Sequence, residues 1–216
     1  MPDHDPNQIT AFWFGTLSDG LADDAHRRAW FKADAERDAG ISRRFAALLE
    51  RAAAGELDHW LDSIQGTLAY ILLCDQLSRQ IHRGTAAAYA TDARALSAAR
   101  SVVAGGADTA LAFDKRAFIY MPFQHAESRL DQHTSVGLFD ALREDTDPAQ
   151  RHHADGFLQH AREHRDIVAR FGRFPHRNAL LDRPSSAAEL DFLRSAGNFG
   201  QAPVRAADQE SPPRDR

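Results

Sequence analysis

The segment between Gly66 and Gly84 constrains the fold of this 216-residue chain more than any other segment. It contains the unbroken run Leu68-Ala69-Tyr70-Ile71-Leu72-Leu73-Cys74, so apolar side chains cover every face of the first half of a predicted helix over residues 68–83. A helix that is apolar all round must be enclosed by other elements. We therefore predict a central, buried helix with the rest of the chain packed around it.

The remaining segments also show helical periodicity. We predict helices over residues 23–54 (with a break at Gly40), 92–104, 122–142 (with Pro122 in the first turn) and 152–171 (ending at Gly172), and a last helix capped by Ser185 or Ser186 with Glu189. No alternating strand pattern exceeds four or five residues. The class is therefore all-α, with about eight or nine helices in one domain over residues 1–200 and a disordered tail over residues 201–216.

Composition limits the partners. A net charge of −5 disfavours nucleic acid, which needs a basic surface. No stretch approaches the roughly 20 apolar residues that cross a bilayer, and the polar N-terminus has no signal-peptide core. We therefore expect a cytoplasmic protein without nucleic-acid or membrane partners. Cys74, the single cysteine, excludes an internal disulfide, and its apolar setting predicts a buried, inert thiol.

Three groups of polar residues interrupt these patterns. In the first, Asp75, Arg79 and Arg83 follow one another at spacings of four on the predicted central helix, with Gln76 beside them. Two arginines four residues apart need a carboxylate or a bound anion between them. The stripe is therefore either an anion-binding site or a buried ion-pair network that ties the helix to its neighbours.

The second group is the stretch around His125, Glu127 and Gln132. On a continuous helix His125 and Gln132 would share a face, whereas Glu127 would point elsewhere. Histidine titrates near neutral pH and suits an acid–base role. Glu127 either contributes to the site or only favours the positive end of a helix dipole.

The third group follows the last long predicted helix. His160 and His164 have the i, i+4 spacing that lets two imidazoles reach one metal ion, but no glutamate follows His160 as in HExxH. Beyond Gly172, polar side chains gather around Pro175, namely Arg173, His176, Arg177 and Asn178. They either line a functional loop or cap the carbonyls at the C-termini of neighbouring helices.

Several short motifs carry a resemblance to a known family. They are Phe12-Trp13-Phe14-Gly15, Gly55-Glu56-Leu57-Asp58-His59-Trp60, Asp75-Gln76, Arg79, Arg83-Gly84-Thr85-Ala86, Tyr120-Met121-Pro122-Phe123, His125, Glu127, Gln132 and Arg170-Phe171-Gly172-Arg173-Phe174-Pro175-His176-Arg177-Asn178. Over about residues 8–201 the chain resembles the bacterial proteins called the domain of unknown function 924 family. The resemblance implies a tetratricopeptide-like, right-handed helical superhelix and brings no established activity or cofactor.

Three functions remain open. In the first, a small anionic ligand with a carboxylate or phosphate group binds in a cleft, with or without catalysis. His125, Glu127 and His176 would be the catalytic residues, and the ligand would be bound by Asp75, Gln76, Arg79, Arg83, Gln132, Arg173, Arg177 and Asn178. The second is a module that binds peptides or proteins in a concave groove between helix pairs. The third is a metal-dependent enzyme that uses His125, Glu127, His164 or His176.

Overall fold

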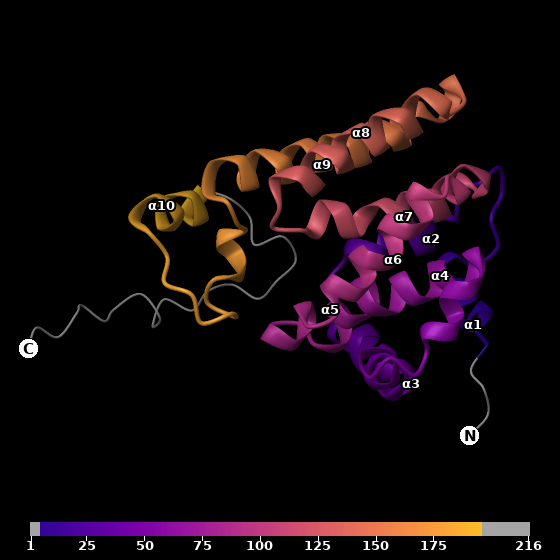
Figure 1. Cartoon of the computed structure of the whole chain (residues 1–216), viewed down its shortest axis with the longest axis horizontal. Helices are drawn as coiled ribbons and strands as arrows, with labels where there is room; N and C mark the ends of the chain where they lie inside the picture. Colours follow the sequence, from indigo (N-terminus) through magenta and orange to yellow (C-terminus); the bar gives the residue numbers. More distant parts are fainter. Residues whose placement is uncertain (1–4, 196–216) are drawn as a thin grey trace, which may run out of the picture.

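The computed structural model describes residues 5–195, and the all-helical prediction is confirmed. Within these residues no strand forms apart from an isolated bridge between Ser18 and Leu21. The α-helices labelled in Figure 1 are α1 (Asn7–Phe14), α2 (Asp24–Phe31), α3 (Ala35–Ala53), α4 (Ile64–Ile71), α5 (Ser78–Ile81), α6 (Asp92–Ala104), α7 (Phe113–His125), α8 (Arg129–Asp145), α9 (Arg151–Phe171) and α10 (Ala187–Ser195). The predicted tail over residues 201–216 lies outside the described residues.

The predicted central helix is present as α4, a π-helical turn η2 (Leu72–Leu77) and α5 in succession. Every residue from Gly66 to Ser78 is buried. Helices α1, α6 and α7 contact α4, while α3 contacts η2 and α5, so the segment is covered by other helices as its composition requires. Cys74 is fully buried there, and burial raises the pKa of its thiol to about 12, as expected for an inert cysteine.

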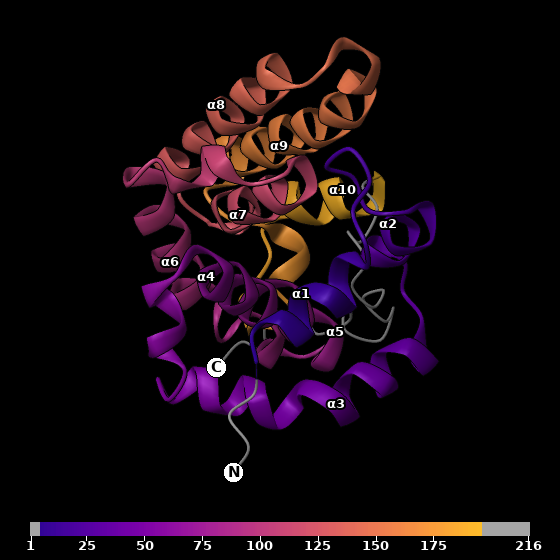
Figure 2. The ribbon, with the colours of Figure 1, turned by 90° about the vertical axis from the view of Figure 1, so that its right-hand side faces the viewer.

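The later helices form a second part of the packing. Helices α8 and α9 run side by side and pack on α7, on the opposite side of the molecule from α3 (Figures 1 and 2). After α9 the chain passes through residues 172–186 to α10. A small apolar cluster of Ile167, Val168 and Phe174, joined by Phe171 and Phe192, fixes this loop to the end of α9.

The predicted break at Gly40 is wrong. Gly40 lies inside α3, and the chain breaks instead between α2 and α3, at residues 32–34. The Asp34 carboxylate accepts hydrogen bonds from the backbone N–H groups of Glu36 and Arg37 and so begins a new helix. This N-cap satisfies donors that a helix start leaves without partners, whereas one interior glycine costs only about 1 kcal/mol.

The predicted helix over residues 122–142 is also wrong. Pro122 lies in the last turn of α7, and the chain leaves the helix after His125. Ser128 then caps α8 by accepting a hydrogen bond from the N–H of Asp131. Because the helix stops between His125 and Gln132, these two side chains do not share a helix face as the spacing predicted.

Two other predicted helix ends are confirmed. Gly172 follows α9 with a φ of 75°, the left-handed conformation that glycine adopts without strain. Ser186 and Glu189 form a capping box in which each side chain binds the other residue's backbone N–H. Within residues 5–195, every helix is too short or too polar to cross a bilayer.

Candidate functional site

The π-helical turn η2 places Asp75 and Gln76 at the centre of the molecule. A wider turn leaves backbone carbonyls without their usual helical partners. Here side chains take over: the hydroxyls of Ser78 and Thr91 donate to the Cys74 carbonyl, at 2.9 and 2.6 Å. Arg79 donates to the Asp75 carbonyl at 2.6 Å. The widened turn is therefore held by specific contacts, and it positions a fully buried carboxylate.

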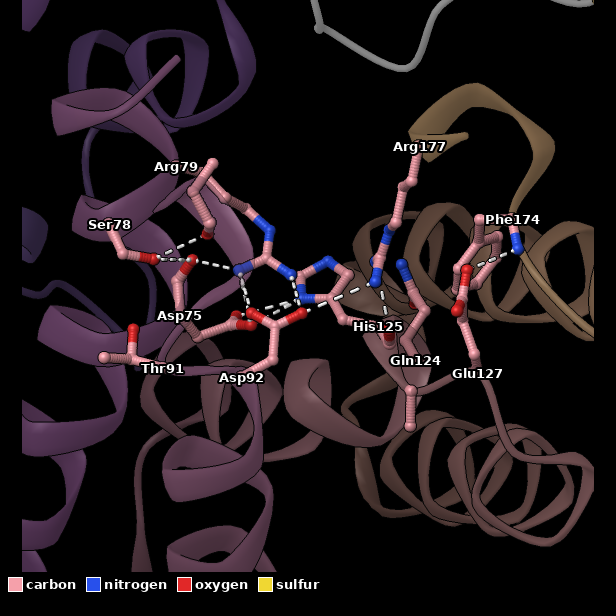
Figure 3. Close-up of polar contacts among 12 residues, drawn as sticks. Asp75, Ser78, Arg79, Thr91, Asp92, Gln124, His125, Glu127, Phe174 and Arg177 are labelled. Carbon is pink, nitrogen blue, oxygen red and sulfur yellow. Dashed lines mark hydrogen bonds and ion pairs between the residues drawn. The ribbon is translucent and has the colours of Figure 1, made fainter. Parts of the chain in front are cut away.

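Asp75 and His125 form a hydrogen-bonded pair between η2 and the end of α7 (Figure 3). The His125 Nδ1 atom lies 2.7 Å from Oδ1 of Asp75. Burial acts to raise the pKa of Asp75, but Arg79 and His125 hold this pKa well below its usual range. Because the carboxylate is an acceptor, Nδ1 of His125 carries the proton.

The second ring nitrogen of His125, Nε2, has no hydrogen bond like that of Nδ1 within the described residues. Burial lowers the pKa of His125, against the opposing effect of Asp75, so the imidazole is neutral near neutral pH. With the proton on Nδ1, the lone pair is on Nε2. No described residue is hydrogen-bonded to Nε2, and the His125 side chain is 16% exposed. The arrangement can therefore accept a proton from a ligand.

Both terminal nitrogens of Arg79 bind groups of the protein. Its guanidinium binds the Asp75 carboxylate at 3.0 Å and both carboxylate oxygens of Asp92 on α6, at 2.9 and 3.0 Å (Figure 3). These contacts raise the pKa of Arg79 against the effect of burial. Arg79 thus holds two carboxylates together through its terminal nitrogens.

Arg177 reaches the same cluster from the loop after α9, in the 3₁₀ turn η6 (Pro175–Arg177). Its guanidinium carbon lies 4.6 Å from the ring centres of both Tyr89 and Phe174, so the group is stacked between two aromatic rings. One terminal nitrogen donates to the backbone carbonyl of His125 at 3.0 Å, and the other lies 3.5 Å from Asp92. The predicted capping of a helix C-terminus is therefore part of its role.

Three polar atoms around this cluster are buried without a hydrogen-bond partner: Nε of Arg177, the hydroxyl of Tyr89 and Oε1 of Gln124. The Arg177 and Gln124 residues are only 6% and 7% exposed. Native proteins rarely leave such atoms unsatisfied, since each costs about 1–3 kcal/mol. A ligand or an ordered water that binds in this part of the cluster could form hydrogen bonds with these three atoms.

Glu127 fixes the loop that carries Arg177. Its carboxylate accepts the N–H of Phe174 at 2.8 Å and binds the guanidinium of Arg183 through both oxygens, at 2.6 and 2.9 Å. Burial acts to raise the pKa of Glu127, but these hydrogen bonds lower it. Glu127 is therefore an ionised anchor for residues 174–183, and its described contacts are structural.

Two further imidazoles lie near this cluster. The His164 ring centre is 6.3 Å from that of His125 and 5.4 Å from that of Phe174. The His176 ring centre lies 5.5 Å from that of Phe174. Burial is the main cause that lowers the pKa of His164 and of His176 to about 3, so both are neutral in the folded protein.

These lowered values predict how stability depends on pH. In the unfolded chain each histidine titrates near 6.5, whereas the folded values are about 3, so the unfolded state binds more protons between these limits. The contribution of each neutral histidine to the free energy of unfolding is fully present above the pKa of the unfolded state. As the pH falls below this pKa, the contribution decreases by about 1.4 kcal/mol per pH unit for each histidine. Urea unfolding at several pH values should show a smaller slope for His164→Gln than for the wild type. An equal slope in both proteins would contradict the assignment.

The other predicted site residues lie as follows. Gln76 donates to Asp75 at 2.6 Å and so belongs to the cluster. Gln132 donates to the carbonyls of Gln124 and Ala126 at the end of α7, at 2.7 and 2.8 Å, which caps that helix. Two residues contact groups outside the cluster: Arg83 binds Asp38 on α3, and Arg173 binds Glu189 on α10. Asn178 donates to Ser185 and accepts a hydrogen bond from Arg183, which binds Glu127.

Sequence reasoning missed Tyr89, Asp92 and Arg183. In the sequence, Asp92 is an acidic residue in the first turn of a predicted helix, where its charge interacts favourably with the helix dipole. Tyr89 is a lone aromatic residue in a 3₁₀ turn, and Arg183 follows the motif-rich stretch. All three depend on long-range contacts, for which the local sequence gives no signal.

Two surface grooves lie apart from this cluster. The larger, of about 700 Å³, separates residues 58–67 from α6 and is lined by Asp58, Leu61, Asp62, Ser63, Ile64, Thr67, Tyr70, Ala93, Arg94, Ser97, Ala98, Ser101, Val102 and Ala107. The smaller, of about 510 Å³, lies beside α10 and includes Arg170, Arg173 and Glu189. Asp75, His125 and Arg177 line neither groove. Among residues 5–195 no group of three His, Cys, Asp or Glu side chains is arranged to hold a metal ion.

Comparison with known proteins agrees with this architecture. The model of a family described as bacterial protein of unknown function (DUF924) matches residues 9–197. The chain belongs to the DUF924 family. A similar solved structure, that of a protein of unknown function from Agrobacterium tumefaciens, has 38% sequence identity to this chain and a TM-score of 0.75. The match covers 88% of this chain and 97% of that one. No curated protein matches this member of DUF924.

The predicted motif residues Asp75, Arg79, His125, Glu127 and Arg177 all belong to one connected network in the fold. The family description carries no activity, so the chemistry of this DUF924 protein has to be argued from the network itself.

Proposed function

We propose that this protein binds a small anionic molecule, with a carboxylate or phosphate group, beside Arg177, and that His125 acts there as an acid–base group. The observation that carries the proposal is the orientation of His125. A buried carboxylate holds Nδ1, and the neutral ring leaves a lone pair on Nε2. An aspartate that orients an imidazole in this way prepares it for proton transfer.

The surroundings support an anionic ligand. Arg177 lies next to His125 and has a buried N–H without a partner. Arginine is well suited to carboxylate and phosphate groups because its planar N–H groups match their oxygens. Glu127, which the sequence suggested as catalytic, instead positions the loop that carries Arg177.

Titration calorimetry with citrate and with inorganic phosphate tests this proposal. We expect saturable binding by the wild type and a loss of about tenfold or more for Arg177→Gln, since a charged hydrogen bond is removed. Arg162→Gln is the matched control, because Arg162 is half-exposed on α9 and its contact with Asp140 is a distant 3.8 Å. A crystal soaked in citrate checks the position without any variant. An anion bound away from His125 and Arg177 would refute the proposal.

A second candidate function rests on the larger groove. A tetratricopeptide-like superhelix binds peptides along a concave wall. The α6 side of the groove includes four small side chains at helical spacing beside Arg94 and Val102, and the small ones leave room for an extended chain: Ala93, Ser97, Ala98 and Ser101. This observation favours a peptide-binding module as the alternative.

Peptide selection separates the two functions. Peptides enriched from a random library on the wild type should lose affinity for Ser97→Trp, which fills the groove, and keep it for Arg177→Gln. Peptides that bind both variants equally well would exclude the groove as their site. Citrate binding should show the opposite dependence on the two variants.

A further inference from the structure

Two buried donors in the cluster have no partner and lie in the same aromatic stack. They are Nε of Arg177 and the hydroxyl of Tyr89, and the Arg177 guanidinium carbon is 4.6 Å from the centre of the Tyr89 ring. Both terminal nitrogens of Arg177 already contact protein, one at the His125 carbonyl and one near Asp92. The cluster therefore has two donors available to a ligand, and one planar carboxylate has two oxygens that can accept from them.

The charges of the cluster limit the ligand further. Three guanidinium groups, of Arg79, Arg177 and Arg183, meet three carboxylates, of Asp75, Asp92 and Glu127. The neighbouring imidazoles of His125, His164 and His176 are neutral, so the network is balanced before any ligand binds. An added single negative charge can be offset by one proton on Nε2 of His125. A phosphate dianion, whose two charges lie on one group, would leave a further charge without compensation in a buried setting, whereas a polycarboxylate such as citrate can insert one carboxylate alone.

We propose that the acid group recognised at this site is a singly charged carboxylate, bound by Nε of Arg177 and the hydroxyl of Tyr89, and not a phosphate dianion. This inference rests on the anion-binding function proposed above and narrows its substrate class to carboxylic acids. In the inferred site, Tyr89 is a ligand-binding residue that no sequence motif indicates.

Nuclear magnetic resonance of ¹⁵N-labelled protein tests the inference with acetate and inorganic phosphate as probes. Each is added at constant ionic strength at about pH 8, where phosphate is mainly a dianion. We expect acetate to shift the Nε–H resonance of Arg177 and the ring resonances of His125 in a saturable way. Its affinity should exceed that of phosphate by about tenfold or more, because phosphate would bury an uncompensated charge.

Tyr89→Phe is the decisive variant, since the hydroxyl makes no hydrogen bond within the protein. Its free energy of unfolding should be unchanged or slightly higher, while acetate binding should weaken by about tenfold. Equal acetate affinity in both proteins would refute the role of Tyr89. Tighter binding of phosphate at the same resonances would overturn the carboxylate assignment and leave the proposed function standing. If neither probe shifted the Arg177 or His125 resonances and citrate did not bind, both the carboxylate inference and the proposed function would be refuted.

Discussion

Replacing Asp75 with alanine is expected to destabilise the protein by about 3–5 kcal/mol, the usual cost of removing one member of a buried ion pair. The carboxylate is fully buried and binds Arg79, His125 and Gln76 together. Its loss would leave a buried guanidinium with one carboxylate partner instead of two and would free the imidazole to turn. The difference in the free energy of unfolding in urea measures this effect.

The control for this substitution is Asp191→Ala. Asp191 also pairs with an arginine, Arg194, but both side chains are exposed, at 72% and 70%. Exposed pairs contribute little, so a change within about 0.5 kcal/mol is expected. Asp75→Asn should fall between the two, because an amide keeps an acceptor for Nδ1 of His125 but not the charge. A loss for Asp75→Ala as small as that of the control would contradict the proposed network.

Replacing Gly66 with alanine is expected to destabilise the protein by about 3 kcal/mol, at the upper end of the range for overpacked positions. A Cβ atom at Gly66 would lie 2.2 Å from the backbone carbonyl oxygen of Trp60. The neighbour is main chain and cannot rotate away, so the 3₁₀ turn Asp58–Asp62 would have to separate from α4. Urea unfolding provides the comparison with the wild type.

Gly137→Ala and Gly156→Ala are matched controls for Gly66→Ala. Both glycines lie within helices, in α8 and α9, and a Cβ atom at either would meet no atom within 4 Å. Alanine favours a helix over glycine by about 1 kcal/mol, so both variants should be slightly more stable than the wild type. If Gly66→Ala were stabilising as well, the close contact with Trp60 would not exist in solution.

Some of the fold could be predicted because its causes are local. The apolar run over residues 68–74 required burial on all sides, and the structure provides it. Gly172 and the Ser186–Glu189 capping box marked helix ends through their own backbone preferences. The helix starts after Asp34 and Ser128 were not predicted, because the predictions relied on Gly40 and Pro122 and not on these capping side chains.

The site was only partly predictable for the same reason. The pair Asp75 and Arg79 follows from a spacing of four, and it is present. Arg83, one further turn along the sequence, contacts α3 instead, because α5 ends at Ile81 and Arg83 no longer follows the helical spacing. Tyr89, Asp92 and Arg183 join the network through contacts between distant segments, which periodicity cannot indicate.

The loop held by Glu127 has a consequence for the order of events during synthesis. Every contact that completes the network joins residues 89–127 to residues 174–183, since Arg177 binds the His125 carbonyl and Glu127 binds Phe174 and Arg183. A nascent chain that has reached α8 already contains Asp75 and His125 but lacks Arg177, which binds the His125 carbonyl. Because chains emerge from the ribosome N-terminus first, the proposed binding site can be complete only after residues 174–183 have been made. A product truncated before Arg177 should therefore not bind the proposed ligand at this site.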